Sequence, residues 1–479
     1  MESIWRKECE FEKREQLTKD IKVEVAIIGA GMAGILTAYL LKEKGINSII
    51  LEANEIASGQ TQNTTAKITS QHGVTYDKLI THFGKEKALF YAAANEQAIG
   101  MYESIIQSKQ ISCHFEKLPS YLYTLTDVEK IQKEVDAARS LAIDAEFTTY
   151  TTLPFEVKGA ARFHNQAMFH PLEFLQEVAK DLTIYEHTMV RDVKDQIITT
   201  DHGRVKANHI VVACHYPFIN VPGYYFARMH QERSYVLCIN NTPKLDGMYK
   251  DESDEGYSFR NYEDMILLGG GGHRTGENPY GGKYEKLRRA AKEFYPEFKE
   301  VCYWSAQDCK TIDSVPYIGA FSASTPNMYV ATGFKKWGMT HSMVSAMILS
   351  DMIAGVKNSY EELYTPQRFM VTASVKSLLD ESKHAATGIL LEKFKLPDTK
   401  LSEVKIGQGA VIDHDGEKIG VYKDPDGKVY AVSTKCTHLG CQLDFNPDEL
   451  SWDCPCHGSR FDYTGKLINN PALENIEHA

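Results

Sequence analysis

The chain has 479 residues and a formal net charge of −11 at pH 7, with 43% hydrophobic and 24% charged residues. This length exceeds what a single hydrophobic core usually serves, so we expect two or three domains. The acidic balance argues against a nucleic-acid partner or an anionic membrane surface, because both call for clustered lysine and arginine.

The N-terminus and the apolar runs indicate where the protein works. The opening MESIWRKECE is charged throughout and lacks the apolar core of a signal peptide. No run approaches the roughly 18–20 apolar residues that cross a bilayer, so we expect no transmembrane segment. These features predict a cytoplasmic protein.

The segment 23–34, VEVAIIGAGMAG, predicts a dinucleotide-binding turn at the start of a parallel sheet. Gly29 permits the tight turn, Gly31 lets the backbone approach a pyrophosphate, and Gly34 lets helix and strand pack closely. The following helix supplies amide donors for the phosphates. A second strand then ends in Glu52, whose carboxylate suits a ribose diol. The complete strand, turn, helix, strand and acid favour a cofactor site over a purely structural glycine turn.

The loop after this unit points to a flavin cofactor. It reads ASGQTQNTTAKITSQ, residues 57–71, and is small, polar and long for such a connection. With the glycine turn it resembles the D-amino-acid oxidase-like (DAO) superfamily of FAD oxidoreductases, in which this loop lies along the pyrophosphate and flavin. Stretches 168–175, 187–218 and 304–355 resemble later cofactor-contacting parts of the same superfamily, and the resemblance covers about residues 20–365. Ala213-Cys214-His215 departs from the family's usual Ala-Thr-Gly or Ala-Thr-His.

The resemblance implies an α/β FAD-binding domain of the Rossmann-like, glutathione-reductase type, accompanied by an α+β substrate domain. We expect the FAD to be held without a covalent bond, so that neither His72 nor Cys309 serves as an anchor. The helix beginning near Thr340 would point its positive N-terminus at the flavin, which favours the reduced anion. The implied cofactor-binding residues are Gly29, Gly31, Gly34, Glu52, Thr65, Val190, Gly333, Gly338 and Thr340.

The substrate domain is expected to cover the flavin face, as in the DAO superfamily. By resemblance Lys67 lies near the flavin ring, and Arg233 and Arg274 are candidates for holding a substrate carboxylate. Arginine suits this task because its planar fork binds both carboxylate oxygens. Ordinary roles, in a solvated loop or between domains, stay open for all three. The implied substrate is a small organic donor of the amine or amino-acid type.

The sequence changes in character from Leu401 onward, where short β-rich segments alternate with Asp-Gly turns. Such a pattern is typical of hairpins in a small antiparallel domain. We therefore expect four parts. The FAD-binding domain is formed by residues 20–85, 161–220 and 306–365, and the substrate domain by residues 86–160 and 221–305. A linker at 366–400 then leads to an all-β domain at 401–479.

Four of the ten cysteines lie in two C-terminal motifs, CTHLGC at 436–441 and CPCHGS at 454–459. Each motif offers one cysteine and one histidine as a pair of ligands, whereas zinc fingers usually group Cys with Cys and His with His. A Rieske [2Fe–2S] centre takes two thiolates on one iron and two imidazoles on the other. Two facing loops of this kind supply that set, and tetrahedral zinc is the alternative.

The two motifs resemble the cluster-binding boxes of the Rieske family. The resemblance implies that Cys436 and Cys454 bind one iron as thiolates, and that His438 and His457 bind the other through their imidazoles. It further implies a disulfide between Cys441 and Cys456 that joins the two loops. It also implies that exposed histidine ligands form the point at which electrons leave.

Together these features predict an FAD-dependent oxidoreductase with an iron–sulfur centre. Oxidation of the donor would reduce FAD, and single electrons would pass through the Rieske cluster to an external quinone or redox protein. With a quinone acceptor the protein would be peripheral at the membrane. One alternative is a flavin oxidase that uses oxygen directly, with the Rieske domain as a redox sensor or interaction module; another is a non-catalytic electron carrier. A Rieske oxygenase is disfavoured, because the sequence shows no separate 2-His-1-carboxylate iron site.

Overall fold

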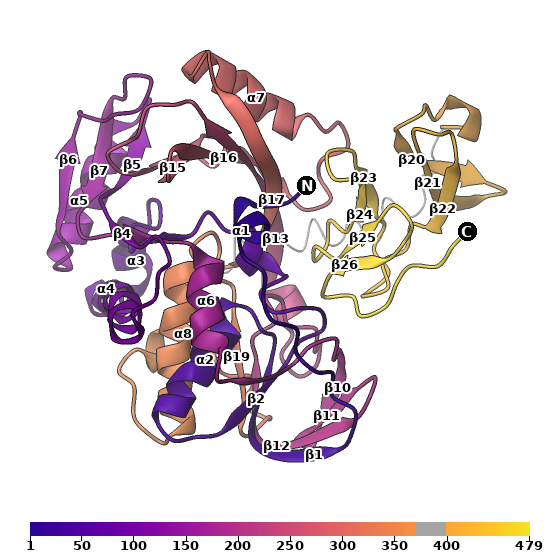
Figure 1. Cartoon of the computed structure of the whole chain (residues 1–479), viewed down its shortest axis with the longest axis horizontal. Coiled ribbons are helices and arrows are strands. Elements are labelled where there is room, and N and C mark those ends of the chain that lie inside the picture. The colour runs from indigo at the N-terminus through magenta and orange to yellow at the C-terminus, as the bar shows by residue number, and fades with distance from the viewer. Residues whose placement is uncertain (369–398) are drawn as a thin grey trace.

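The computed structural model describes residues 1–368 and 399–479, arranged as two large sheet-based units and a smaller C-terminal unit (Figure 1). Most of the expected linker, residues 366–400, lies outside the described residues. In the part of the chain that is described, no helix combines the length and apolarity needed to cross a membrane.

The first unit is an eight-stranded sheet with a parallel centre. Its path runs β10-β11-β12-β1-β2-β9, and β19 pairs with β12 and β18. β1 is fully buried over Val25–Ile28, as expected of a central strand covered on both faces. The strands of this sheet are β1 (Ile21–Ile28), β2 (Ser48–Leu51), β9 (Thr183–Tyr185), β10 (Val190–Lys194), β11 (Ile197–Thr200), β12 (Arg204–Val212), β18 (Tyr317–Ala320) and β19 (Met328–Thr332).

Helices α2 (Met32–Glu43), α6 (Pro171–Ala179) and α8 (Gly338–Ile353) lie together beside this sheet (Figure 1). α2 and α8 are buried along nearly their whole length because they pack on each other as well as on the sheet. Both begin at the same edge of the sheet, where the parallel strands end, and this is the usual position of a ligand site in α/β folds. The remaining helices of this region are α3 (Tyr76–Phe83), α4 (Lys85–Lys109) and α9 (Glu361–Tyr364).

The second unit is a mainly antiparallel sheet of eight strands in the order β17-β13-β16-β15-β14-β5-β7-β6. Two helices flank it, α5 (Val128–Ser140) and α7 (Lys283–Phe294). β17 continues through residue 306, where a domain boundary was expected, because one unbroken strand serves both the sheet and the edge of the cofactor region. The strands are β5 (Ser120–Thr124), β6 (Ala145–Thr148), β7 (Gly159–Phe163), β13 (Met229–Asn240), β14 (Met248–Asp251), β15 (Ser258–Tyr262), β16 (Met265–Arg274) and β17 (Lys299–Thr311).

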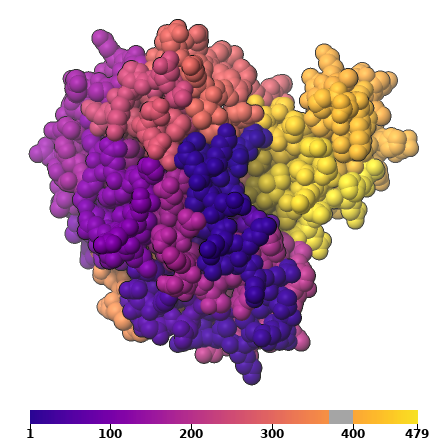
Figure 2. Space-filling model, in the orientation of Figure 1, coloured from indigo at the N-terminus to yellow at the C-terminus, as the bar shows by residue number. Residues whose placement is uncertain are grey.

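Two short elements tie the large units together. A small sheet of β3 (Lys67–Ile68), β8 (Ala167–Met168) and β4 (Glu116–Lys117) links them. The N-terminal segment with α1 (Ile4–Glu8) runs over the face seen in Figure 2, beside the C-terminal unit. The buried indole of Trp5 donates from Nε1 to the carbonyl of Thr64 at 2.7 Å, which fixes the polar loop after β2.

The C-terminal unit consists of two small antiparallel sheets. The Asp-Gly hairpin predicted from the sequence joins β20 to β21, where Asp415 and Gly416 have positive φ of 54° and 85°. Both central residues of a type I′ turn require such values. One sheet contains β20 (Gly409–His414), β21 (Glu417–Lys423) and β22 (Val429–Ser433), and the other β23 (Asp444–Asn446), β24 (Ser451–Asp453), β25 (Arg460–Asp462) and β26 (Leu467–Asn469).

Candidate active site and metal centre

A cavity of about 1200 Å³ opens at the C-terminal end of β1. This volume exceeds the range of about 300–1,000 Å³ typical of sites for drug-sized ligands, so it can accept an extended dinucleotide. Its wall combines the glycine turn, the polar loop after β2 and the segment before α8. Six of the predicted cofactor residues line it: Gly29, Gly31, Glu52, Val190, Gly333 and Gly338.

The glycine turn has no room for side chains. Gly29 has φ of +109°, and a Cβ there would lie 2.8 Å from the carbonyl oxygen of Ala213. A Cβ on Gly34 would lie 2.0 Å from the carbonyl oxygen of Gly29, so α2 packs directly on the turn. The backbone therefore forms the cavity wall itself, with the N-terminus of α2 at its edge. Such an arrangement suits a pyrophosphate.

Glu52 follows β2 directly and lies at the wall of this cavity. Its carboxylate accepts hydrogen bonds from the backbone N–H groups of Ala30, at 2.8 Å, and Asn54, at 2.9 Å. Burial raises the pKa of Glu52, and these two donors counteract the rise. The held carboxylate can accept hydrogen bonds from vicinal hydroxyls, the chemistry expected for a ribose.

Three other predicted cofactor residues lie outside the wall of the large cavity. Gly34 packs under the turn, and Thr65 lines a smaller neighbouring cavity. Thr340 is buried in the first turn of α8, where its Oγ1 donates to the carbonyl of Thr69 at 3.1 Å. Thr340 thus holds the polar loop against the helix.

The two residues considered as covalent anchors have other partners. The ring of His72 stacks on Trp337 with centroids 4.9 Å apart, and its Nδ1 lies 2.7 Å from the Tyr91 hydroxyl. Among the described residues that line the large cavity, neither His72 nor Cys309 is present.

A second cavity, of about 100 Å³, adjoins the far end of the first and shares residues such as Ala306 and Asp308 with it. It lies between the polar loop and strands β13 and β16 of the second sheet. Its lining includes the charged residues Lys67, Lys250, Lys336, Asp254 and Asp308.

Burial strongly perturbs three charged groups of this second cavity: Lys67, Lys250 and Asp308. Lys67 donates from Nζ to the carbonyl of Tyr249 at 2.8 Å, and burial together with Lys250 lowers its pKa to about 7. Burial also lowers the pKa of Lys250 to about 8 and raises that of Asp308 to about 6. Groups whose pKa values are shifted toward neutrality in a cleft are candidates for binding and proton transfer.

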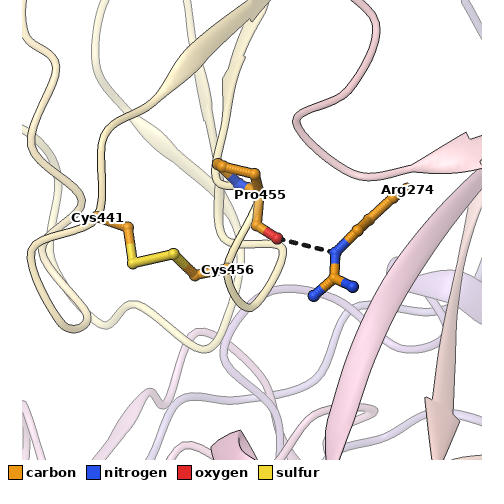
Figure 3. The surroundings of a disulfide bond; sticks show 4 residues. All are labelled: Arg274, Cys441, Pro455 and Cys456. Atoms are coloured by element: carbon orange, nitrogen blue, oxygen red, sulfur yellow. Dashed lines mark hydrogen bonds between the residues drawn. A yellow bond between two sulfur atoms is a disulfide. The ribbon is translucent and has the colours of Figure 1, made fainter. Parts of the chain in front are cut away.

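Arg233 and Arg274, the two predicted carboxylate-binding residues, both have partners in the C-terminal unit. The guanidinium of Arg233 forms a buried ion pair with Glu449, whose side chain is 5% exposed against 2% for Arg233, and also contacts Ser305. Arg274 donates from Nε to the carbonyl of Pro455 at 3.1 Å (Figure 3). Both arginines contact the C-terminal unit, and their donors toward it are already used.

The two C-terminal motifs form matching loops at the tips of hairpins. The carbonyl of Cys436 accepts from Gly440 N, and the carbonyl of Cys454 accepts from Gly458 N, both at 2.9 Å. Gly440 and Gly458 have φ of +77° and +80°, conformations that favour glycine. The motifs are therefore two copies of one turn. A disulfide between Cys441 and Cys456 joins them, as the resemblance implied (Figure 3).

The four predicted ligands fall into a thiol pair and an imidazole pair. Cys436 and Cys454 are buried free thiols that hydrogen-bond to each other, which lowers the pKa of Cys436. The rings of His438 and His457 are perpendicular, with centroids 4.9 Å apart. The Nε2–H of His438 donates to Asn220 Oδ1 at 2.8 Å, which leaves the lone pair on its buried Nδ1 for a metal.

This pairing fits two irons better than one zinc. In a tetrahedral zinc site all ligand atoms would lie within about 4.6 Å of one another, twice the longest bond. Among the described residues, the only group of three or more such atoms within 4.8 Å is Cys441, Cys454 and Cys456, two of which form the disulfide. The four predicted ligands thus do not converge on one metal ion. A two-iron cluster needs them to form two separate pairs, one for each iron.

The expectation that the histidine ligands are exposed is wrong for His457, whereas His438 is partly exposed. His457 is only 5% exposed, because its backbone carbonyl accepts from Gln231 and the edge of its ring meets Phe226. Asn220 covers Nε2 of His438. These covering residues come from the two larger units that form the flavin side of the molecule. The edge of the metal centre that carries His438 and His457, here called the histidine edge, therefore faces those units. Sequence reasoning missed them because they lie more than 200 residues earlier in the chain.

Comparison with known families divides the chain into two parts. A family model described as "FAD dependent oxidoreductase" matches residues 24–352, and one described as "Rieske [2Fe-2S] domain" matches residues 395–479.

Two relatives show how far the likeness extends. A "Putative Rieske 2Fe-2S iron-sulfur protein YhfW" of Bacillus subtilis (strain 168) is 37% identical over 495 aligned positions, covering 99% of this chain and 97% of that protein. The cytochrome b6-f complex iron-sulfur subunit 2 of the Cyanophora paradoxa cyanelle is 36% identical over 88 residues, covering 18% of this chain and 35% of its own.

Solved structures share the fold of the first two units. Glycine oxidase from Geobacillus kaustophilus aligns with a TM-score of 0.61 at 15% identity, over 73% of this chain and 99% of its own. L-amino acid deaminase from Proteus vulgaris aligns with a TM-score of 0.62 at 16% identity, over 75% and 100%.

Proposed function

Because this chain belongs to the FAD-dependent oxidoreductase family and carries a Rieske [2Fe–2S] domain, we propose that it oxidises a small amine or amino acid and passes the electrons singly to an external acceptor. The predicted fold class and the two cofactors, FAD and a [2Fe–2S] cluster, are confirmed by these matches. One observation carries the proposal: the second cluster loop is seated against strands that also line the large cavity.

The small cavity is the proposed donor site. It adjoins the end of the large cavity that lies next to β17, where Ala306 and Asp308 line both. Lys250 and Lys336 can attract a carboxylate, while Asp308 can accept from an amino group. The volume of about 100 Å³ admits only a small molecule. Names of structural neighbours such as glycine oxidase and L-amino acid deaminase agree with this class of donor.

Lys67 is the proposed proton acceptor in that site. When bound, FAD can accept two electrons from the donor's C–H bond, and the [2Fe–2S] cluster can carry one electron at a time. Amine oxidation requires a neutral amine, so the ammonium of the donor must lose a proton. With a pKa of about 7, Nζ of Lys67 is partly unprotonated near neutral pH and can take it.

The metal centre is proposed to hold its cluster through the paired ligands. Cys436 and Cys454 would bind one iron, and His438 and His457 the other. The Asn220 contact orients His438 and holds its tautomer, which is a typical role of residues that support metal ligands. The disulfide keeps the two loops at a fixed spacing.

We propose a cytoplasmic location, with peripheral membrane binding if the acceptor is a quinone. Support comes from the cysteines outside the cluster loops, which are free thiols as expected in a reducing compartment. They are Cys9, Cys113, Cys214, Cys238, Cys302 and Cys309.

Anaerobic titration of the purified holoprotein with small amines and amino acids tests the proposal. The expected result is bleaching of the flavin absorbance followed by the EPR signal of a reduced Rieske cluster, with about two irons per chain. If the flavin bleaches and the cluster signal never appears, the relay is wrong and direct reaction with oxygen is favoured. Stoichiometric zinc without iron would contradict the metal assignment.

A further inference from the structure

The C-terminal domain docks on one face of the ribbon that β13 and β17 form. In this antiparallel pair Arg233 lies opposite Gln307, and Tyr235 lies opposite Ser305. Opposite residues share a face, and residues two apart on one strand share it as well. Gln231, two residues before Arg233, therefore points the same way. This face meets the C-terminal domain through the Arg233–Glu449 ion pair.

Two glutamines of this face hold the second cluster loop by its backbone. Gln231 donates from Nε2 to the carbonyl of His457, and Gln307 donates from Nε2 to the carbonyl of Gly458, both at 2.7 Å. Both glutamines are buried, with exposed fractions of 2% and 1%. We call Gln231 and Gln307 the glutamine clamp.

The loop fits the clamp closely. A Cβ on Gly458 would lie 2.7 Å from both the Cβ of Gln231 and the Nε2 of Gln307. Only glycine allows this approach, and the positive φ of Gly458 independently favours glycine there. Glycine at position 458 is thus required both by the turn of the cluster loop and by the close contact with the glutamine clamp.

The clamp also belongs to the wall of the flavin cavity. Gln307 lines the cavity, and its backbone N–H donates to Oε1 of Gln60, a cavity residue of the polar loop, at 2.6 Å. On the other side, Asn470 of the C-terminal domain accepts from Gln231 at 3.4 Å and donates to the carbonyl of Cys214 at 3.1 Å. Cys214 lines the same cavity. One layer of side chains therefore separates the cavity from the loop of a cluster ligand.

From this geometry we infer that Gln231 and Gln307 are positioning residues that hold the histidine edge of the cluster against the flavin site for electron transfer. The inference rests on the proposed function, since it concerns the path between the two centres. With both cofactors bound, each donor molecule would supply two electrons, and these would cross the clamp one at a time. A one-electron redox protein would accept each of them, and Gln231 and Gln307 would hold the histidine ligands on the side from which the electrons arrive.

The test uses the full-length holoprotein in three forms: wild type, the double variant Gln231→Leu/Gln307→Leu, and the control Asn278→Leu. Leucine approximates the volume of glutamine and removes the donors. Asn278 also makes amide hydrogen bonds with the C-terminal domain, to Asn446 at 3.0 Å and Asp448 at 2.9 Å, and neither of these partners belongs to a cluster loop. The flavin is photoreduced by a flash with EDTA as the sacrificial donor, and cluster reduction is followed by absorbance and freeze-quench EPR.

Removing both hydrogen bonds should slow cluster reduction about tenfold, the factor that corresponds to about 1.4 kcal/mol, while flavin photoreduction is unchanged. Hydrogen exchange of the peptide covering residues 454–461 should rise in the double variant and stay at the wild-type level in Asn278→Leu. The midpoint potentials of both cofactors should stay constant, which separates positioning from a change in driving force.

The outcomes distinguish the clamp from the relay itself. If the wild-type cluster stays oxidised after flavin reduction, the proposed function fails. If wild type relays electrons and the double variant does so at the same rate, the clamp inference is overturned. Should the double variant lose its cofactors, the isosteric single variant Gln307→Glu, which places an oxygen against the Gly458 carbonyl, must show the same slowing. Equal slowing in Asn278→Leu would also overturn the inference, because docking in general would then explain it.

Discussion

The two sheets of the C-terminal domain differ in how they are held. The half built from β23–β26 carries the cluster loops and rests on the β13–β17 ribbon through buried charges and amides, whereas the β20–β22 half extends away from the flavin-side units (Figure 1). That distal half has a small apolar cluster of Val404, Ile412 and Val421, and its Tyr422 and Val432 join the apolar cluster of the β23–β26 half. The contrast teaches that the position of the metal centre is set by contacts outside its own domain, while the distal half only completes the domain's fold.

The largest effect is expected at the metal centre itself. Cys454→Ser replaces a thiolate ligand with a hydroxyl, so the variant should lose its iron and the whole Rieske EPR signal while the flavin absorbance remains. Cys9→Ser, which changes a buried thiol far from the loops, is the control and should keep full iron content. Retention of a normal cluster in Cys454→Ser would contradict the assignment of Cys454 as an iron ligand.

The buried ion pair of the docked half comes next. Glu449→Gln leaves Arg233 buried without its carboxylate, whereas Arg460 keeps Asp453, and breaking such a buried pair costs about 3–5 kcal/mol. Thermal unfolding followed at the cluster absorbance should shift strongly downward. Asp181→Asn, which breaks an exposed pair with Lys42, should change stability by less than about 1 kcal/mol. Equal effects from both variants would contradict the special role of the docked face.

The same carboxylate gives the docking a pH dependence. Burial alone would raise the pKa of Glu449, but Arg233 and Arg460 outweigh it and lower the value to about 2. A depressed folded-state pKa contributes stability above the unfolded value of about 4.5, which is lost as pH falls toward 2. Stability of the docked half should therefore fall between about pH 4.5 and 2, and the Glu449→Gln variant should lack this component in pH-dependent melting curves.

A smaller effect, upstream of the clamp, is expected from Lys67. Loss of a general base typically costs about a hundredfold or more, so Lys67→Met should slow flavin reduction by an identified donor by at least that factor. In wild type this rate should rise as pH increases through about 7, where Nζ loses its proton, and the variant should lose that rise. Cluster reduction after flash photoreduction should be unchanged, and Lys244→Met, an exposed lysine, is the control.

The distal half should give the smallest effect. Gly416→Ala places a side chain at φ of +85°, although the added Cβ meets no atom within 4 Å. The expected cost is the backbone strain of about 1–2 kcal/mol. Melting should shift accordingly, while the rate of electron transfer from flavin to cluster stays at the wild-type value. A slowed transfer would show that the two halves are coupled more tightly than their contacts suggest.

Sequence reasoning succeeded where a site is made by adjacent residues. The glycine turn with Glu52 and the two cluster motifs each bring their chemistry within one short segment, so spacing alone predicted a cofactor turn and matched loops. The small cavity was different: Lys250 and Asp308 come from separate strands, and only folding brings them to Lys67. Lys336 lies within the stretch 304–355 that resembles the DAO superfamily, but its proximity to the small cavity depends on how that stretch packs against the second sheet.

The arginines show that residue type alone does not identify the carboxylate that a guanidinium meets. A guanidinium fork suits any carboxylate, and Arg233 meets that of Glu449, 216 positions later in the chain. The expected exposure of His457 was wrong for a related reason. Family resemblance describes an isolated Rieske domain, whereas Asn220 and Phe226 belong to the partner units of this chain.

The covered histidine edge also affects how long the cluster survives. Imidazole-bound iron in an open loop is within reach of chelators and dissolved oxidants, which remove or damage it by direct contact. Here the ring of His457 meets Phe226, and Asn220 blocks the outer nitrogen of His438. Docking of the C-terminal domain on the β13–β17 ribbon therefore restricts the access of small reagents to the imidazole ligands. Cluster loss to a chelator should consequently become faster when this docking is weakened.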